Sequence, residues 1–168
     1  MLIILSGLPG AGKTTIAREL ARRLKAVHIR IDTIEQAIKN SGLLSGPMND
    51  AGYRVGYAIA EDNLSLGQIV IADSVNPIQL TRDRWIAAAQ NTHQKAVEIE
   101  TKCSDASEHQ RRVEARTADI AGHRVPSWRE VSELDYHPWN REHLVIDTAH
   151  CSPTQAVNLI VSEIEKLS

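Results

Sequence analysis

Phenylalanine is absent from this chain, and aromatic residues make up only 4% of it. The core must therefore be built from Ile, Leu, Val and Ala. Long apolar runs are also missing: the opening run, Met1 to Leu5, has about five residues and is soon followed by glycine and proline, too short for a membrane span or for the apolar region of a signal peptide. We therefore expect no membrane association.

Strong net charge and a cysteine pattern are lacking too. The formal net charge of −2 over 168 residues argues against bulk electrostatic binding to nucleic acid or an anionic membrane, although it leaves room for a local basic channel. The two cysteines, Cys103 and Cys151, lack metal-ligand spacing, which predicts reduced thiols in a cytoplasmic protein. Seven histidines are scattered without paired spacing, so surface or packing roles are favoured over metal ligation. This length suits one domain, as a monomer or homodimer.

One short stretch carries a specific signal. Residues 7–14, Gly-Leu-Pro-Gly-Ala-Gly-Lys-Thr, fit the phosphate-binding pattern GxxxxGK[ST] of a P-loop, or Walker A motif. Its glycines let successive backbone N–H groups face the phosphates at the positive end of the next helix, where Lys13 adds a charge. The Thr14 hydroxyl is placed to ligate Mg²⁺. The predicted nucleotide-binding residues are Gly7, Leu8, Pro9, Gly10, Ala11, Gly12, Lys13, Thr14 and, at the limit of reach, Thr15.

The flanks of this loop favour a P-loop over a simple glycine-rich turn. Met1 to Leu5 is continuously apolar, as in a strand buried on both faces of a parallel sheet. Ile16, Leu20 and Leu24 then recur at helical spacing. The strand, loop and helix that the motif requires are all predicted.

Strands and helices alternate along the rest of the chain. Asn76 and Pro77 resemble an N-cap and a first helical residue, and Ser152 to Gln155 a capping box. Gly52 and Gly56 permit close approach to another element. The predicted strands are 27–31 (near a sheet edge), 69–73 (central), 95–101 and 143–147; the predicted helices are 33–40, 49–66, 76–90, 107–116, a short one within 128–134, and a closing helix whose Ala156, Leu159, Ile160 and Ile164 face the core.

This order predicts an α/β fold of the P-loop NTPase type: a five-stranded parallel sheet with helices on both faces and a small lid at about 105–141, all in a single domain spanning 1–168. Ligands of such sheets bind outside the carboxyl ends of the strands. The P-loop, Asp32 and Asp73 each follow a predicted strand. We therefore expect all three to meet at one edge of the sheet.

Two acids have candidate roles. Asp73 matches the acid of a Walker B strand, which holds the magnesium shell opposite Thr14, with a turn-initiating aspartate as the alternative. Its neighbour is Ser74 rather than a glutamate that would polarise water, so no base for ATP hydrolysis is evident. Asp32 can accept the proton of a substrate hydroxyl, and with Glu35 it also makes a passable capping box. Arg30, two residues earlier, suits contact with substrate or γ-phosphate, or a surface position.

A basic segment follows the fourth predicted strand, where a phosphoryl-transfer enzyme needs a mobile lid. Guanidinium groups there can neutralise the transferred phosphoryl group and exclude water, although a solvated helix with a Glu108–Arg112 pair is the alternative. Trp128 and Trp139 favour packing over lining a substrate pocket. The candidate arginines are Arg111, Arg112, Arg116, Arg124 and Arg129, with Arg112 and Arg116 preferred.

These motifs resemble the P-loop kinase family with a nucleoside monophosphate kinase-like fold, in particular small kinases such as gluconate kinase, adenylylsulfate kinase, chloramphenicol phosphotransferase, the kinase domain of polynucleotide kinase, and zeta toxins. The resemblance covers nearly the whole chain in element order, and its most specific part is the P-loop. It implies ATP and Mg²⁺, Asp32 as the base, and Arg112 and Arg116 as lid arginines within the lid-like stretch 111–116. Residues 41–61, the substrate region, match no member of the group.

The predicted function is ATP-dependent transfer of the γ-phosphoryl group to a hydroxyl of a small molecule, catalysed by Asp32, Lys13, Arg112 and Arg116. A polynucleotide 5′-hydroxyl kinase is an alternative, but the composition does not favour a nucleic-acid partner. A nucleotide-dependent regulatory protein with little turnover is another. A GTPase switch is disfavoured because no guanine-reading N/T-K-x-D motif is present.

Overall fold

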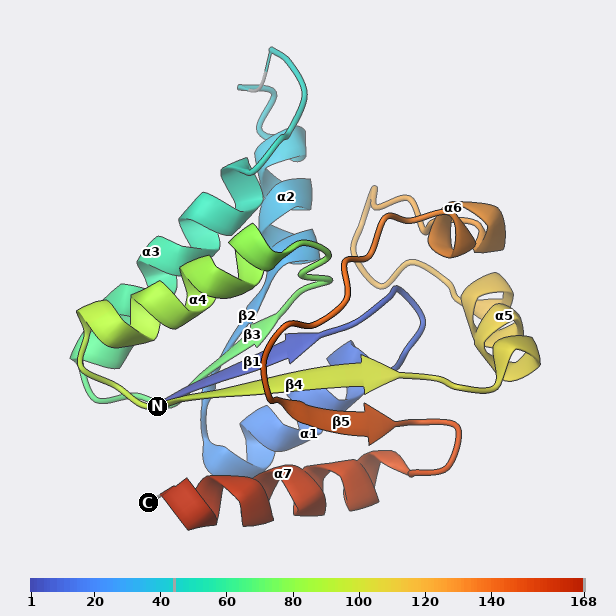
Figure 1. Cartoon of the computed structure of the whole chain (residues 1–168). Coiled ribbons are helices and arrows are strands. Elements are labelled where there is room, and N and C mark those ends of the chain that lie inside the picture. Colours follow the sequence, from blue (N-terminus) through green and yellow to red (C-terminus); the bar gives the residue numbers. More distant parts are fainter. Residues whose placement is uncertain (44, 168) are drawn as a thin grey trace.

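A five-stranded parallel sheet forms the middle layer, in the order β2-β3-β1-β4-β5 (Figure 1). The computed structural model describes residues 1–43 and 45–167. The strands are β1 (Leu2–Ser6), β2 (Val27–Arg30), β3 (Val70–Asp73), β4 (Ala96–Lys102) and β5 (Leu144–Asp147). The helices are α1 (Lys13–Leu24), α2 (Ile31–Asn40), α3 (Ala51–Ser65), α4 (Gln79–Asn91), α5 (Ala106–Ala115), α6 (Trp128–Ser132) and α7 (Pro153–Leu167).

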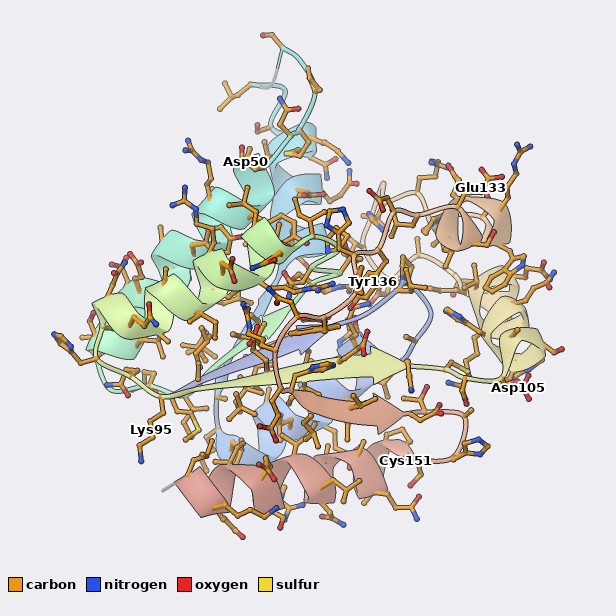
Figure 2. All side chains as sticks on the ribbon, in the orientation of Figure 1. Asp50, Lys95, Asp105, Glu133, Tyr136 and Cys151 are labelled. Carbon is orange, nitrogen blue, oxygen red and sulfur yellow. The ribbon has the colours of Figure 1, made fainter. Side chains whose placement is uncertain are left out.

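The core lies on both faces of the sheet, because side chains of a strand alternate between its faces. Ile3 and Leu5 of β1 pack with α1 and α7 on one face. Leu2 and Ile4 pack with α3 and α4 on the other. All four are fully buried, as the continuous apolar run predicted. Figures 1 and 2 show the two helix layers and the side chains that fill the space between them and the sheet.

The strand register brings the P-loop, Asp32 and Asp73 together at the carboxyl end of the sheet. Asp73, the last residue of β3, is paired with Arg30 of β2 on one side and with Leu5 of β1 on the other. The residues that follow these strands therefore leave the sheet side by side. This confirms the expected strand positions, with β2 at an edge and β3 inside, and the expected meeting of the P-loop with the two acids.

Asn76 is not the N-cap of α4, contrary to prediction. The helix begins at Gln79 and its N-cap is Ile78. Asn76 instead has φ +48° and is fully buried, where its side chain donates to Ser6 Oγ at 2.9 Å and accepts from Trp85 Nε1 at 3.1 Å. The amide satisfies two buried polar groups, a tertiary demand that outweighs its capping preference.

The capping box predicted from Asp32 and Glu35 is also wrong. The α2 helix begins at Ile31, so Asp32 lies in its first turn and Arg30 is the N-cap, without a side-chain capping bond. The capping box of α7 is confirmed: Gln155 N donates to Ser152 Oγ at 3.3 Å, and Ser152 N donates to Gln155 Oε1 at 2.9 Å. Leu159 was expected in the core but is exposed.

Two glycines of α3 allow the close approach expected of them. A Cβ on Gly56 would lie 2.6 Å from Ile31 Cδ1 and 3.2 Å from Trp85, and one on Gly52 would lie 2.3 Å from the Glu35 side chain. The helices α2, α3 and α4 therefore pack closely against one another, and α3 lies over β2 and β3. Beyond the carboxyl ends of the strands, α5 and α6 stand apart from both layers (Figure 1). Within the described residues, no helix is long and apolar enough to cross a membrane.

Candidate active site

The P-loop joins β1 to α1 with the backbone geometry that its glycines predict. Gly7, Gly10 and Gly12 have φ of +136°, +81° and +99°, values that side-chain-bearing residues rarely adopt. Lys13 folds back over the loop, and its Nζ donates to the carbonyl oxygens of Gly7 at 2.7 Å and Leu8 at 2.9 Å. Burial lowers the pKa of Lys13 to about 8, although the negative charges of Asp73 and Asp32 oppose that shift.

A cavity of about 870 Å³ opens above the loop, within the size range of ligand sites. It unites segments from five regions of the chain at the carboxyl edge of the sheet. Gly7, Leu8 and Ala11 belong to the loop but do not line the cavity. Its lining includes Pro9, Gly10, Gly12, Lys13, Thr14, Thr15, Arg18, Arg30, Asp32, Asp73, Ser74, Arg112, Arg116, Asp119, His123 and residues 148–153.

Asp73 and Thr14 form an oxygen-rich corner of this cavity. Asp73 is 3% exposed, and its Oδ2 lies 3.1 Å from His28 Nε2. Burial by itself raises the pKa of Asp73, but the His28 hydrogen bond, the charge of Lys13 and a hydrogen bond from Thr14 outweigh it and leave the pKa below its usual value. Asp73 is therefore an ionised carboxylate beside a hydroxyl, the hard oxygen donors that suit Mg²⁺.

Asp32 also lines the cavity, at the start of α2. Its side chain is 37% exposed, and Oδ2 is 3.4 Å from Arg30 Nη2. Arg30 is buried, which rules out the surface position considered for it, and it pairs through both Nη atoms with the carboxylate of Asp119. Burial lowers the pKa of Arg30, but hydrogen bonding to Asp119 and the charge of Asp32 raise it above its ordinary value.

The five candidate arginines separate into two groups. Arg112 and Arg116 line the cavity, whereas Arg111, Arg124 and Arg129 pair with nearby glutamates on the surface. Arg112 does more than form the expected pair with Glu108 (2.7 Å): it also donates to Thr148 Oγ1 at 2.9 Å and to the Thr148 carbonyl at 3.0 Å.

Trp128 and Trp139 both make packing contacts, as predicted, and neither lines the cavity above the P-loop. Trp128 meets the His109 ring edge-on at 5.2 Å between centroids, and His109 Nε2 lies 2.8 Å from the Pro9 carbonyl of the P-loop. Trp139 stacks on His143, with the guanidinium of Arg82 4.2 Å from its ring centroid.

The loop after β5 was missed by the sequence analysis. Thr148 to Pro153 line the cavity, and Thr148 Oγ1 donates to the P-loop carbonyl of Ala11 at 3.0 Å. Figure 2 shows Cys151 in this loop, close to the start of α7. The signal was available, since this loop also follows a parallel strand and must reach the same edge. Asp119 was missed because no local pattern distinguishes it.

The sheet order, the P-loop and the acids at the carboxyl edge define a P-loop nucleotide-binding protein of the kinase-like type. Residues 2–131 match the model of a family described as "AAA domain", and the chain belongs to that family.

Solved structures share the fold over nearly the whole chain. An adenylylsulfate (APS) kinase, CysC, from Mycobacterium tuberculosis in complex with AMPPNP and APS has a TM-score of 0.72 at 15% identity, covering 98% of this chain and 96% of that one. Kti12 from Chaetomium thermophilum in complex with ADP-AlF3 has a TM-score of 0.72 at 22% identity, covering 99% and 98%. A gluconokinase from Sinorhizobium meliloti has a TM-score of 0.68 at 18% identity, covering 98% of this chain and 91% of that one.

A shorter match links the chain to a curated protein. Over 59 residues it is 37% identical to the nucleoside-triphosphatase THEP1 of Methanocaldococcus jannaschii. The match covers 35% of this chain and only 29% of that relative.

Proposed function

We propose that this protein transfers the γ-phosphoryl group of ATP to a hydroxyl of a small molecule, with Asp32 as the general base. The observation that carries the proposal is that Asp32 shares one cavity with the P-loop and Asp73 while its carboxylate stays partly exposed. An acid in that position can meet a second substrate that enters opposite the nucleotide.

The P-loop amides and Lys13 would hold the β- and γ-phosphates, so Lys13 would exchange its present carbonyl partners for phosphate oxygens. Asp32 would accept the proton of the acceptor hydroxyl as its oxygen bonds to the γ-phosphorus. The bond from that phosphorus to the bridging oxygen would break, and ADP would leave with the electron pair.

Thr14 and Asp73 fit Mg²⁺, since they place a hydroxyl beside an ionised carboxylate. Among the described residues no cluster of three or more acidic, His or Cys side chains forms a metal cage. This agrees with an ion that takes one or two protein ligands and fills its shell with phosphates and water. When bound, Mg²⁺ would neutralise charge on the phosphates.

Arg112 and Arg116 would act from a lid formed by residues 105–141. Arg112 already joins α5 to the loop after β5. Arg116 lines the cavity at the end of α5 and would stabilise charge on the transferred group. The 59-residue match to a nucleoside-triphosphatase makes hydrolysis the competing outcome to test.

The test is incubation with γ-labelled ATP, Mg²⁺ and pools of hydroxyl compounds, with oligonucleotides as a separate pool. Asp32→Asn should lower transfer by about 100-fold or more while nucleotide affinity stays within a few fold, because only proton acceptance is lost. Asp62→Asn, an exposed acid on α3, is the control. Label appearing only in free phosphate, at equal rates in both variants, would identify a hydrolase and refute the proposed base.

A further inference from the structure

Inside the cavity, the carboxylate of Asp119 forms ion pairs with two arginines. Its Oδ2 accepts from Arg30 Nη1 at 2.8 Å and from Arg18 Nη2 at 2.5 Å, and its Oδ1 accepts from Arg30 Nη2 at 3.1 Å. Two N–H groups of one guanidinium on two oxygens of one acid is the geometry by which arginine binds carboxylates, phosphates and sulfates. Hydrogen bonding from Arg30 holds the pKa of Asp119 far below its usual value, so the carboxyl is an anion.

The two partners differ in how firmly the fold holds them. Arg30 ends strand β2 and is 6% exposed, and its Nε is buried without a hydrogen-bond partner in the described part of the chain. Asp119 lies between α5 and α6, in a stretch without helix or strand, and is 36% exposed. A buried guanidinium requires an anion, but nothing in its position requires that the anion come from this loop.

The position of Arg30 points to the acceptor rather than to the nucleotide. Its strand is separated from β1 and the P-loop by β3, and its Nη2 lies 3.4 Å from Asp32 Oδ2. Arg112 and Arg116, in contrast, come from α5 and the residue that follows it. An anion seated on Arg30 would therefore lie beside the proposed base.

We propose that the acceptor is an anionic hydroxyl compound, whose phosphate, sulfate or carboxylate group binds Arg30 and Arg18 in place of Asp119. The inference rests on the proposed phosphotransfer. Asp119 then acts as an internal substitute that neutralises the arginines until the acceptor arrives. Because this substitute competes with the acceptor, removing its charge increases acceptor affinity.

The first test measures anion binding without turnover. Inorganic sulfate is titrated calorimetrically into protein saturated with AMPPNP and Mg²⁺, so that the P-loop is already filled. Asp119→Asn should tighten sulfate binding by about tenfold, since the competing carboxylate is gone. Arg18→Ala, at a half-exposed position, should weaken it by about tenfold with no risk to the core. Arg22→Ala, exposed on the same helix one turn later, is the matched control and should change nothing.

Nucleotide affinity shows whether the arginines bind the anionic group of the acceptor or the γ-phosphate. AMPPNP binding should stay within about threefold in all three variants. Equal losses of AMPPNP and sulfate binding in Arg18→Ala would assign the arginine to the γ-phosphate and overturn the inference. Sulfate binding that is the same in the wild type, Arg18→Ala and Asp119→Asn would also overturn it.

The second test divides the acceptor pools by charge into neutral polyols, hydroxy acids, phosphomonoesters and sulfate esters. Label should enter one of the anionic pools, and that pool identifies the group on the acceptor. Transfer to the neutral pool alone would overturn the anionic acceptor while leaving the kinase function in place. If the Arg18→Ala and Asp119→Asn variants change sulfate affinity as expected but no pool accepts label, the anion site is upheld and the proposed kinase function is refuted.

Discussion

His28 Nε2 lies 3.1 Å from Asp73 Oδ2, so a side chain of the edge strand β2 orients the acid at the end of the neighbouring strand β3. Hydrogen-bond partners of a metal ligand commonly affect metal affinity by 10- to 100-fold. We expect His28→Ala to raise the Mg²⁺ concentration for half-maximal activity by about tenfold. Affinity for metal-free ATP should be unchanged. Magnesium titrations of the activity check this, with His93→Asn, between α4 and β4, as the control; an unaltered magnesium requirement would contradict the role of His28.

Arg116 and Arg111 lie five positions apart in the proposed lid but face different surroundings. Arg116 lines the cavity, whereas Arg111 is mostly exposed and bonds Glu108. Arg116→Ala should lower kcat/KM by about 100-fold, since it removes charge stabilisation of the transferred group. Arg111→Ala should change it by less than about twofold, as expected of an exposed pair. Steady-state kinetics distinguish the two, and similar losses would show that the lid acts only through its overall charge.

Gly7 is required by the packing of the P-loop against β4. With φ of +136°, it faces β4 so closely that a Cβ would lie 2.0 Å from the carbonyl oxygen of Thr101. Backbone cannot yield as a flexible side chain does, so Gly7→Ala should lower the free energy of unfolding by about 3 kcal/mol or more. Gly46→Ala, whose Cβ would meet nothing within 4 Å, should be neutral. Urea unfolding of both variants measures this; equal stability would mean that the loop can move away from β4.

All three tyrosines have raised pKa values because burial disfavours the phenolate, and that of Tyr53 rises to about 12. Above about pH 10 the unfolded chain loses tyrosine protons that the folded chain keeps, so stability must fall as pH rises from there. Tyrosinate absorbance should stay low in the native protein at about pH 10.5 and rise on unfolding. Tyr57→Phe should reduce the pH-dependent loss of stability, because its hydroxyl, which donates to the Thr81 carbonyl, is then absent. Native tyrosines that titrate at about pH 10 would contradict the burial of their hydroxyls.

Much of the fold followed from local patterns. The apolar runs at β1 and β3 predicted buried strands, and the alternation of strands and helices predicted the parallel sheet that was found. The two capping errors occurred where a polar residue had two uses. Asn76 resembled a cap but satisfies buried Ser6 and Trp85, because an unpaired buried polar group costs more than a missing cap.

The sequence by itself determined the P-loop, since the glycine spacing, Lys13 and Thr14 are contiguous and their backbone conformation is a local property. It also determined that Asp32 and Asp73 would reach the same edge, because parallel strands end together. Only the tertiary structure decided that Arg30 is buried against Asp119 and that the loop after β5 completes the cavity. Those pairings join residues about 90 and 140 positions apart, and such partners are selected by packing and charge in three dimensions rather than by any repeating pattern along the chain.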